Sequence, residues 1–100
     1  MLKIFETLIS LSRERGLRIE ISFLKCKGRL LIDKELELKA VDEFGNISSW
    51  ARVFPGISIQ NILDQCGVKK IDVYKGQEKI VENENIYEVI RELGGIASYK

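Results

Sequence analysis

Apolar and polar residues alternate along Leu17–Phe23, which is the period of a β-strand with one buried face. The dipeptide Lys27-Gly28 follows, and Gly accepts the positive φ that a two-residue hairpin loop requires. This loop predicts a second strand that returns alongside the first. In the resulting register Ile19 lies opposite Leu36, so that apolar residues of the two strands share one face.

The second strand is expected to continue through Ala40 into a turn that starts at Asp42. Asp at the first position of a type I turn and Gly45 in a left-handed position fit a three-residue hairpin with a bulge. The tighter alternative loop sets two cations directly across from each other, which is unfavourable. The bulged turn instead predicts that Val41 lies opposite Ile47.

A third strand is expected over residues 47–54, and it contains a break in the alternation. Trp50, Arg52 and Phe54 occupy apolar-phase positions, and Lys34 of the second strand lies beside them. A buried unpaired cation is costly, so each of these side chains either extends its charge to solvent or lines a cleft. The first interpretation is favoured. The alternative is a small-anion site near Trp50 and Arg52 with an aromatic wall.

The segment Leu2–Arg15, which precedes this sheet, has the periodicity of an amphipathic helix. Its apolar side chains fill close to half of the helical wheel, which is wider than contact with one sheet requires. Such a face either sinks deeply into the core or contacts a second chain. Gly16 is placed to end the helix.

The remaining chain predicts two helices that flank a hairpin. The first is expected over Ser58–Cys66 with Ser58 as its cap, and residues 68–81 form a hairpin around Lys75-Gly76. The last helix covers residues 85–93 and is closed by Gly94-Gly95. The order predicts a single α+β domain over residues 1–100: helix, three-stranded antiparallel meander, helix, β-hairpin and helix, with the helices packed on one face of the sheet.

The composition narrows the class of protein. A chain of 100 residues has room for one modest core, and a formal net charge of +1 indicates no particular partner. No apolar run approaches the roughly 18 residues of a membrane span, and the start lacks a signal-peptide pattern. We therefore expect a cytoplasmic protein without membrane contact. Abundant Ile, Lys and Glu together with the absence of His favour a thermophilic source.

The two cysteines, Cys26 and Cys66, are interpreted as free thiols. Cys26 lies at the tip of the first expected hairpin, and Cys66 lies on the apolar side of a helix. Neither has a second Cys or a His at metal-ligand spacing. We expect both to behave as small hydrophobic residues, without a disulfide.

The sequence carries no signature of catalysis. Without His the chain lacks the commonest general base and metal ligand. A Gly-rich phosphate loop, a nucleophile elbow and an HExxH pattern are also missing. Its carboxylates alternate on strands or lie on helix exteriors, where solvation accounts for them. We expect no enzymatic activity, no metal and no cofactor.

Positive charge is concentrated at the start of the chain, where residues 1–29 contain seven Lys and Arg against three Asp and Glu. Lys25, Lys27 and Arg29 form one basic group, and Arg18 with the arginines before it forms another. An extended strand separates the two groups by about 30 Å, so they are expected to be separate patches. A nucleic-acid-associated protein that uses these strand-end cations is the alternative function.

The favoured function is a small interaction module that self-associates and has no catalytic activity of its own. Its candidate contacts are apolar residues that one small core is not expected to absorb. They are Leu2, Phe5, Ile9, Val41 and Ile47, together with Leu24 and Leu31 on the sheet face predicted to be exposed. The partner is expected to be a second copy or another protein.

Overall fold

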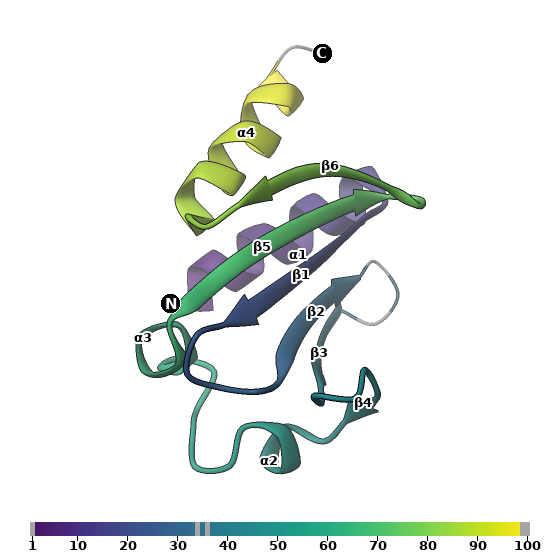
Figure 1. Ribbon diagram of the computed structural model, residues 1–100. Helices are drawn as coiled ribbons and strands as arrows, with labels where there is room; N and C mark the ends of the chain where they lie inside the picture. The colour runs from purple at the N-terminus through teal and green to yellow at the C-terminus, as the bar shows by residue number, and fades with distance from the viewer. Residues whose placement is uncertain (1, 34, 36, 99–100) are drawn as a thin grey trace.

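The described part of the chain has an α+β fold around one antiparallel sheet (Figure 1). The structure is a computed structural model that describes residues 2–33, 35 and 37–98. Its strands are β1 (Leu17–Phe23), β2 (Arg29–Asp33), β3 (Glu37–Val41), β4 (Ile47–Ser48), β5 (Val68–Lys75) and β6 (Glu78–Asn83). Its helices are α1 (Leu2–Arg15), α2 (Trp50–Val53), α3 (Ile62–Cys66) and α4 (Ile86–Ser98). The six strands lie in the order β4-β3-β2-β1-β5-β6, which confirms the predicted α+β class with one more strand than expected.

The interior strand β1 buries every second side chain, as its alternation predicts. Ile19 and Ile21 are fully buried, whereas Arg18 between β1's apolar positions is exposed. Helix α1 lies on the buried face against β1 and β2, and α4 packs against β5, β6 and α1. These helices leave the opposite face of the sheet uncovered (Figure 1). Side chains from α1, α4 and α3, from the four central strands and from Phe54 form the core.

Helix α1 has the predicted bounds, and most of its wide apolar face sinks into this core. Phe5 and Leu8 are 2% and 0% exposed. Ser12, the polar residue within the apolar face, is also fully buried, and its Oγ donates a hydrogen bond to the carbonyl oxygen of Leu17 at 2.6 Å. This bond fixes the entry into β1 and satisfies a buried hydroxyl. Gly16 makes the turn between them with φ of 67°.

The predicted two-residue hairpin at Lys27-Gly28 is wrong. Ile19 pairs with Ile32 and not with Leu36, a displacement of four residues. The reason lies beyond the end of β1, where the backbone N–H groups of Leu24 and Lys25 donate to the carbonyls just before β5, at Gly67 and Cys66 (2.8 and 2.9 Å). Residues 24–26 are therefore held at the C-terminal end of α3 before the chain turns back into β2.

The expectation of two free thiols is also wrong, because Cys26 and Cys66 form a disulfide. Their Cα atoms are 5.3 Å apart, within the usual range for a bridge. The hydrogen bonds of Leu24 and Lys25 to Gly67 and Cys66 bring Cys26 to the end of α3, where Cys66 is fully buried. The support that free thiols gave to an intracellular location is therefore lost.

The chain from Arg29 to Val41, expected as a single strand, is divided into β2 and β3, which pair with each other. Asp33 Oδ1 accepts a hydrogen bond from the Glu35 N–H at 2.8 Å, the geometry by which Asp favours a turn. The next turn is the bulged one predicted. Val41 pairs with Ile47, as expected from that turn.

The predicted third strand, residues 47–54, is wrong after its first two residues. Ser49 caps α2, and its Oγ accepts a hydrogen bond from the Arg52 N–H at 3.3 Å. Trp50 Nε1 donates to the carbonyl of Ile57 at 2.7 Å. Phe54 is 1% exposed and packs edge-on against Phe23 in the core. A local cap thus overrides the weak alternation of this segment.

The later elements match the prediction in type and differ in their ends. Helix α3 starts at Ile62, later than the expected cap at Ser58. Lys75 pairs with Glu78, so the β5–β6 loop is one residue later than the predicted Lys75-Gly76. Asn85 Oδ1 accepts from the backbone N–H groups at the start of α4, as its capping position predicts. The helix then continues to Ser98, past the two glycines expected to close it.

Strand β6 contains a register shift against β5. Val73 pairs with Val81 but Tyr74 pairs with Lys79, so Ile80 is an additional residue in the edge strand. A β-bulge of this kind bends an edge strand and interrupts its ladder of hydrogen bonds. Ile80 is 40% exposed.

The disulfide is expected to be a major contribution to stability. It closes a loop over a sequence separation of 40 residues, which in the chain-entropy model stabilises the folded state by about 4 kcal/mol. Cys26→Ser should lower the free energy of unfolding, measured by urea titration, by about 3–4 kcal/mol. The reductant dithiothreitol should lower the wild-type value similarly and leave Cys26→Ser unchanged. Equal stability of oxidised and reduced wild type would contradict this.

Candidate functional site

The uncovered face of the sheet is the candidate site, and its side chains form three rows that cross the strands. The strand registers place residues of three neighbouring strands side by side in each row, from β2, β1 and β5 or from β1, β5 and β6. The rows are Arg29–Ser22–Lys70, Glu20–Asp72–Glu82 and Arg18–Tyr74–Lys79. A row of three carboxylates therefore lies between two rows that carry cations.

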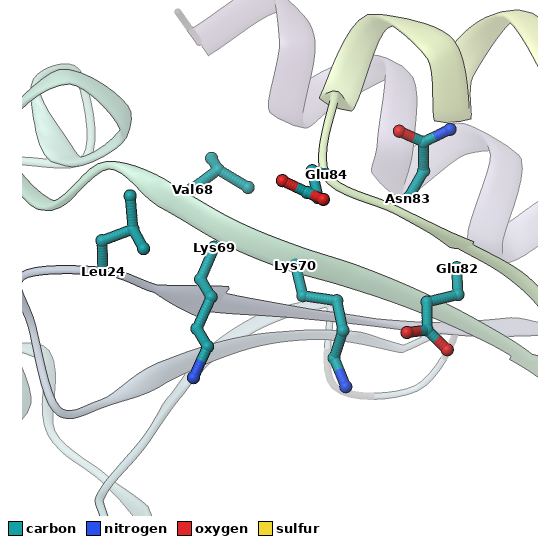
Figure 2. Close-up of a pocket in the computed structure, with 7 residues that line it drawn as sticks. All are labelled: Leu24, Val68, Lys69, Lys70, Glu82, Asn83 and Glu84. Carbon is teal, nitrogen blue, oxygen red and sulfur yellow. The ribbon is translucent and has the colours of Figure 1, made fainter.

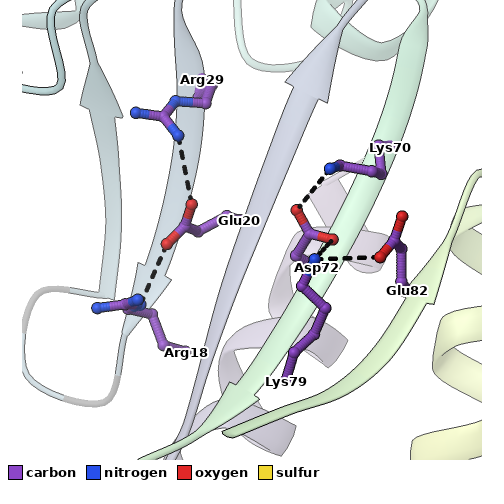
Figure 3. A network of polar contacts seen from close by, with 7 residues as sticks. All are labelled: Arg18, Glu20, Arg29, Lys70, Asp72, Lys79 and Glu82. Atoms are coloured by element: carbon purple, nitrogen blue, oxygen red, sulfur yellow. Dashed lines mark hydrogen bonds and ion pairs between the residues drawn. The ribbon is translucent and has the colours of Figure 1, made fainter. Parts of the chain in front are cut away.

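Carboxylates directly opposite each other on neighbouring strands repel, so this acidic row depends on its cations. Glu20 is held from both sides, with Arg18 Nε at 3.2 Å and Arg29 Nη1 at 3.5 Å from its oxygens (Figure 3). The two arginines belong to the separate basic groups that the sequence placed about 30 Å apart. The β1–β2 register brings one member of each group to the same carboxylate.

Asp72 is the buried centre of the second half of the network, and the residue is 6% exposed. Lys70 Nζ lies 3.5 Å from Asp72 Oδ2, and Lys79 Nζ lies 3.3 Å from Asp72 Oδ1. The contact with Oδ1 is an ion pair whose geometry does not meet that of a hydrogen bond. Lys79 also donates to Glu82 at 3.0 Å. The contacts with Glu82 and then with Asp72 raise the pKa of Lys79 above its ordinary value of 10.5.

Tyr74 lies between two cations in the third row. The guanidinium of Arg18 is 4.9 Å from the centre of the Tyr74 ring, and the ammonium of Lys79 is 5.9 Å from it. Both distances are within the range of cation–π contacts. An aromatic ring with cations on either side thus forms part of the uncovered face.

Apolar side chains gather at the β2–β4 end of the same face. We call Leu31, Val41, Phe44 and Ile47 the apolar corner. Phe44 is 80% exposed and Ile47 is 52% exposed. Beside them is a hollow of about 210 Å³, which we call the corner hollow. Its lining is Arg18, Glu20, Arg29, Leu30, Leu31, Val41, Gly45 and Ile47. The corner hollow therefore combines apolar walls with the two arginines that hold Glu20.

A second hollow of about 410 Å³ lies beside the disulfide and includes several residues of the predicted anion cleft. Lys27, Arg52 and Phe54 contribute to it, but so do Asp42 and Glu43. The premise of the anion cleft was that Arg52 and Trp50 share a strand face, and this premise is wrong because both lie on α2. Two cations, Lys27 and Arg52, thus line this hollow together with two carboxylates.

A third hollow, of about 630 Å³, lies between the start of β5 and the end of β6. Figure 2 shows Lys69 and Lys70 extending to one side of the strands, with Glu84 and Asn83 on the other. Glu82 also lines it, and the exposed Leu24 stands at its far end. Two lysines and two glutamates line this hollow, and Lys70 and Glu82 among them belong to the Asp72 network.

The remaining predicted site residues are placed in different environments. Phe5 is enclosed in the core, and Ile9 is partly buried against it. Lys25 is exposed on the segment held at the end of α3. Lys34 lies outside the described residues, as does the side chain of Leu2. Of the residues predicted for self-association, Ile47 is therefore prominent at the surface, with Val41 beneath it at 7% exposure.

Sequence reasoning missed most of the charged rows and did not single out the exposed Phe44. The alternation of β1 identified Arg18 and Glu20 as polar-face residues, but their neighbour Asp72 comes from β5. No local pattern links two strands so far apart in the sequence. Phe44 could have been recognised as an apolar residue at the tip of a predicted turn.

Comparisons with known proteins add no assignment: no family model matches the chain, and no curated protein or solved structure matches it significantly. Within the described residues, no three His, Cys, Asp or Glu side chains are grouped so that they could hold a metal ion. The helices of that part of the chain are too short or too polar to cross a bilayer.

The raised pKa of Lys79 predicts a specific pH dependence. A folded-state pKa above 10.5 means that the ammonium stabilises the fold below that pH, and that this stabilisation is lost as the pH rises through the folded-state pKa. The difference in urea midpoint between wild type and Lys79→Met should therefore shrink above pH 10.5. A Lys79→Met difference that is constant to pH 12 would contradict the proposed ion pairs.

Proposed function

We propose that this protein is a non-catalytic interaction module that self-associates through the apolar corner of its uncovered sheet face. The observation that carries the proposal is that Ile47, which is 52% exposed, lines the corner hollow with Val41 and Leu31, while Phe44 in the turn just before it is 80% exposed. Single exposed apolar residues are normal, but a contiguous group beside a hollow is typical of a protein contact. The rest of this face is charged, so the apolar corner stands out from its surroundings.

The placement of α1 supports the sheet face over the helix as the contact surface. The sequence offered α1 as a candidate because of its wide apolar face, and the core now accounts for Phe5, Leu8 and Leu11. Among the exposed apolar side chains, Phe44 and Ile47 lie together on β4 and the turn before it, whereas Leu24, Ile80 and Tyr87 lie in separate segments. This turn is ordered by its own hydrogen bonds, so that little conformational entropy is lost when it is covered.

The state of the carboxylates supports a role without catalysis. Glu20 and Asp72 each lie between two cations, and Glu82 binds Lys79. A general acid or base needs a free proton position and a pKa near the working pH. Carboxylates committed to ion pairs are better suited to fixing a surface than to moving protons.

The test is the oligomeric state measured by sedimentation equilibrium. Wild type is expected to populate dimers at tens to hundreds of micromolar, and Ile47→Asp should weaken association at least about tenfold because it puts a charge into the apolar contact. Ile80→Asp is the matched control, since Ile80 is 40% exposed on the opposite edge of the sheet, and it should leave association unchanged. A wild type that remains monomeric at several hundred micromolar would remove the support for self-association.

A second candidate function is binding of single-stranded nucleic acid to the same face. It is favoured by the Arg18–Tyr74–Lys79 row, in which an aromatic ring lies between two cations on an open sheet. Bases stack on such rings while cations contact the phosphates. Nucleic-acid binding requires cations of the two basic groups to lie on one face of the sheet. Arg18 and Arg29, one from each group, meet this requirement because both contact Glu20.

Filter binding of single-stranded DNA and RNA across a range of salt concentrations tests this candidate. Under it, retention should fall steeply between about 50 and 200 mM salt because phosphate contacts release counterions. Tyr74→Ala should weaken retention at low salt, while Tyr87→Ala, which removes an exposed ring from α4, should not. Absence of retention at the lowest salt rejects the candidate.

A further inference from the structure

We propose that the self-associated form is a twofold dimer in which Phe44 of each copy enters the corner hollow of the other. This inference rests on the proposed self-association and specifies its contact. The turn between β3 and β4 is then both the inserted element and, through Gly45, part of the receiving wall. The partner is therefore a second copy of this chain.

The size and lining of the corner hollow fit an aromatic ring. It measures about 210 Å³, and Leu31, Val41 and Ile47 form its apolar walls. An apolar protein cavity of about 150 Å³ accommodates benzene, so a phenyl ring fits this space. Phe44 of the same molecule is not part of the lining and is 80% exposed, so it is available to a second copy.

The charges at the rim fit the residue that precedes Phe44. Arg18 and Arg29 each use one nitrogen on Glu20, and their side chains remain 48% and 41% exposed. Arg29 Nη2 lies 3.9 Å from the position that a Cβ on Gly45 would occupy, so it faces the turn side of the hollow. Glu43 is exposed beside Phe44. An inserted Phe44 would thus bring a carboxylate to guanidinium groups that still have free donors.

The inserted turn is held in one conformation before it binds. Asp42 Oδ1 accepts hydrogen bonds from the N–H groups of Phe44 and Asn46, both at 2.9 Å. Gly45 has φ of 86°, a conformation that few residues other than Gly adopt. The Asp42 carboxylate accepts hydrogen bonds within the turn, so the carboxylate of this turn that can contact a partner is Glu43. Pre-organisation of this kind reduces the entropy lost on association.

Because the turn lies next to the hollow in each molecule, two copies can satisfy each other in a closed twofold dimer. In an isologous contact the same patch serves both copies, and residue i of one meets residue j of the other in both directions. Here the protruding turn and the receiving hollow are neighbours in one molecule, since Gly45 and Ile47 border both. A twofold axis that passes between the turn and the hollow therefore places Phe44 of each copy in the corner hollow of the other.

A charge exchange between two variants tests this contact. Glu43→Arg and Arg29→Glu should each weaken self-association at least about tenfold, because each places like charges together in both halves of the dimer. An equimolar mixture of the two variants should restore association to within about threefold of wild type. In the mixed dimer one half holds the native pair of charges and the other half holds the same pair with its signs exchanged, so both halves attract.

Sedimentation equilibrium with one labelled variant measures the mixed dimer. Glu84→Arg, an exposed site away from the corner, is the control and should not change association.

A second variant separates binding from folding. Phe44→Ser should abolish the dimer while leaving the melting temperature of the monomer within about 2 °C, because an 80% exposed side chain contributes little to the fold. If wild type dimerises but the mixture stays monomeric, or Phe44→Ser still dimerises, the reciprocal insertion is overturned and self-association by another surface remains. If wild type is monomeric throughout, the proposed function and this inference both fail.

Discussion

The pairing of β1 with β5 is the constraint on which the rest of the structure depends. It joins strands that are distant in the sequence, from Leu17 with Lys75 to Phe23 with Val68. Backbone hydrogen bonds continue this alignment past the end of β1 and hold residues 24 and 25 against α3. Because β5 takes one side of β1, β2 takes the other, and the connection must travel around α3. That route brings the two cysteines together and sets the β1–β2 register.

The sequence predicted what local physics determines. The bounds of α1, the buried face of β1 and the turn at Asp42 follow from helical period, alternation and turn chemistry, and all three are found. The β1–β2 register was missed because a displacement of four residues keeps every side chain on its face, so the alternation fits both registers. The disulfide was missed for the same reason, since it depends on the long-range alignment. Three members of the apolar corner, Leu31, Val41 and Ile47, were predicted as candidate contacts, and Phe44 was not.

The uncovered face illustrates how one such alignment creates an electrostatic pattern that no single strand contains. β1 alone offers an arginine and a glutamate in alternation, and β5 offers a lysine and an aspartate. Side by side, they place carboxylates in one row and cations in the next, which makes an otherwise repulsive row of acids stable. The partly exposed ion pairs of Arg18 and Arg29 with Glu20 contribute little stability individually. Their effect is to hold Arg18 and Arg29 in fixed positions beside the apolar corner.

The two edges of the sheet differ from its face in how they can meet another molecule. Strand β4 is only two residues long, and β6 is interrupted at Ile80 and carries Lys79 and Glu82. Short, bulged and charged edge strands are poor templates for the backbone of a neighbouring chain. Growth of the sheet from molecule to molecule is therefore blocked at both margins. A protein built this way can present apolar side chains to a second copy while its own backbone resists the open-ended stacking that leads to fibrils.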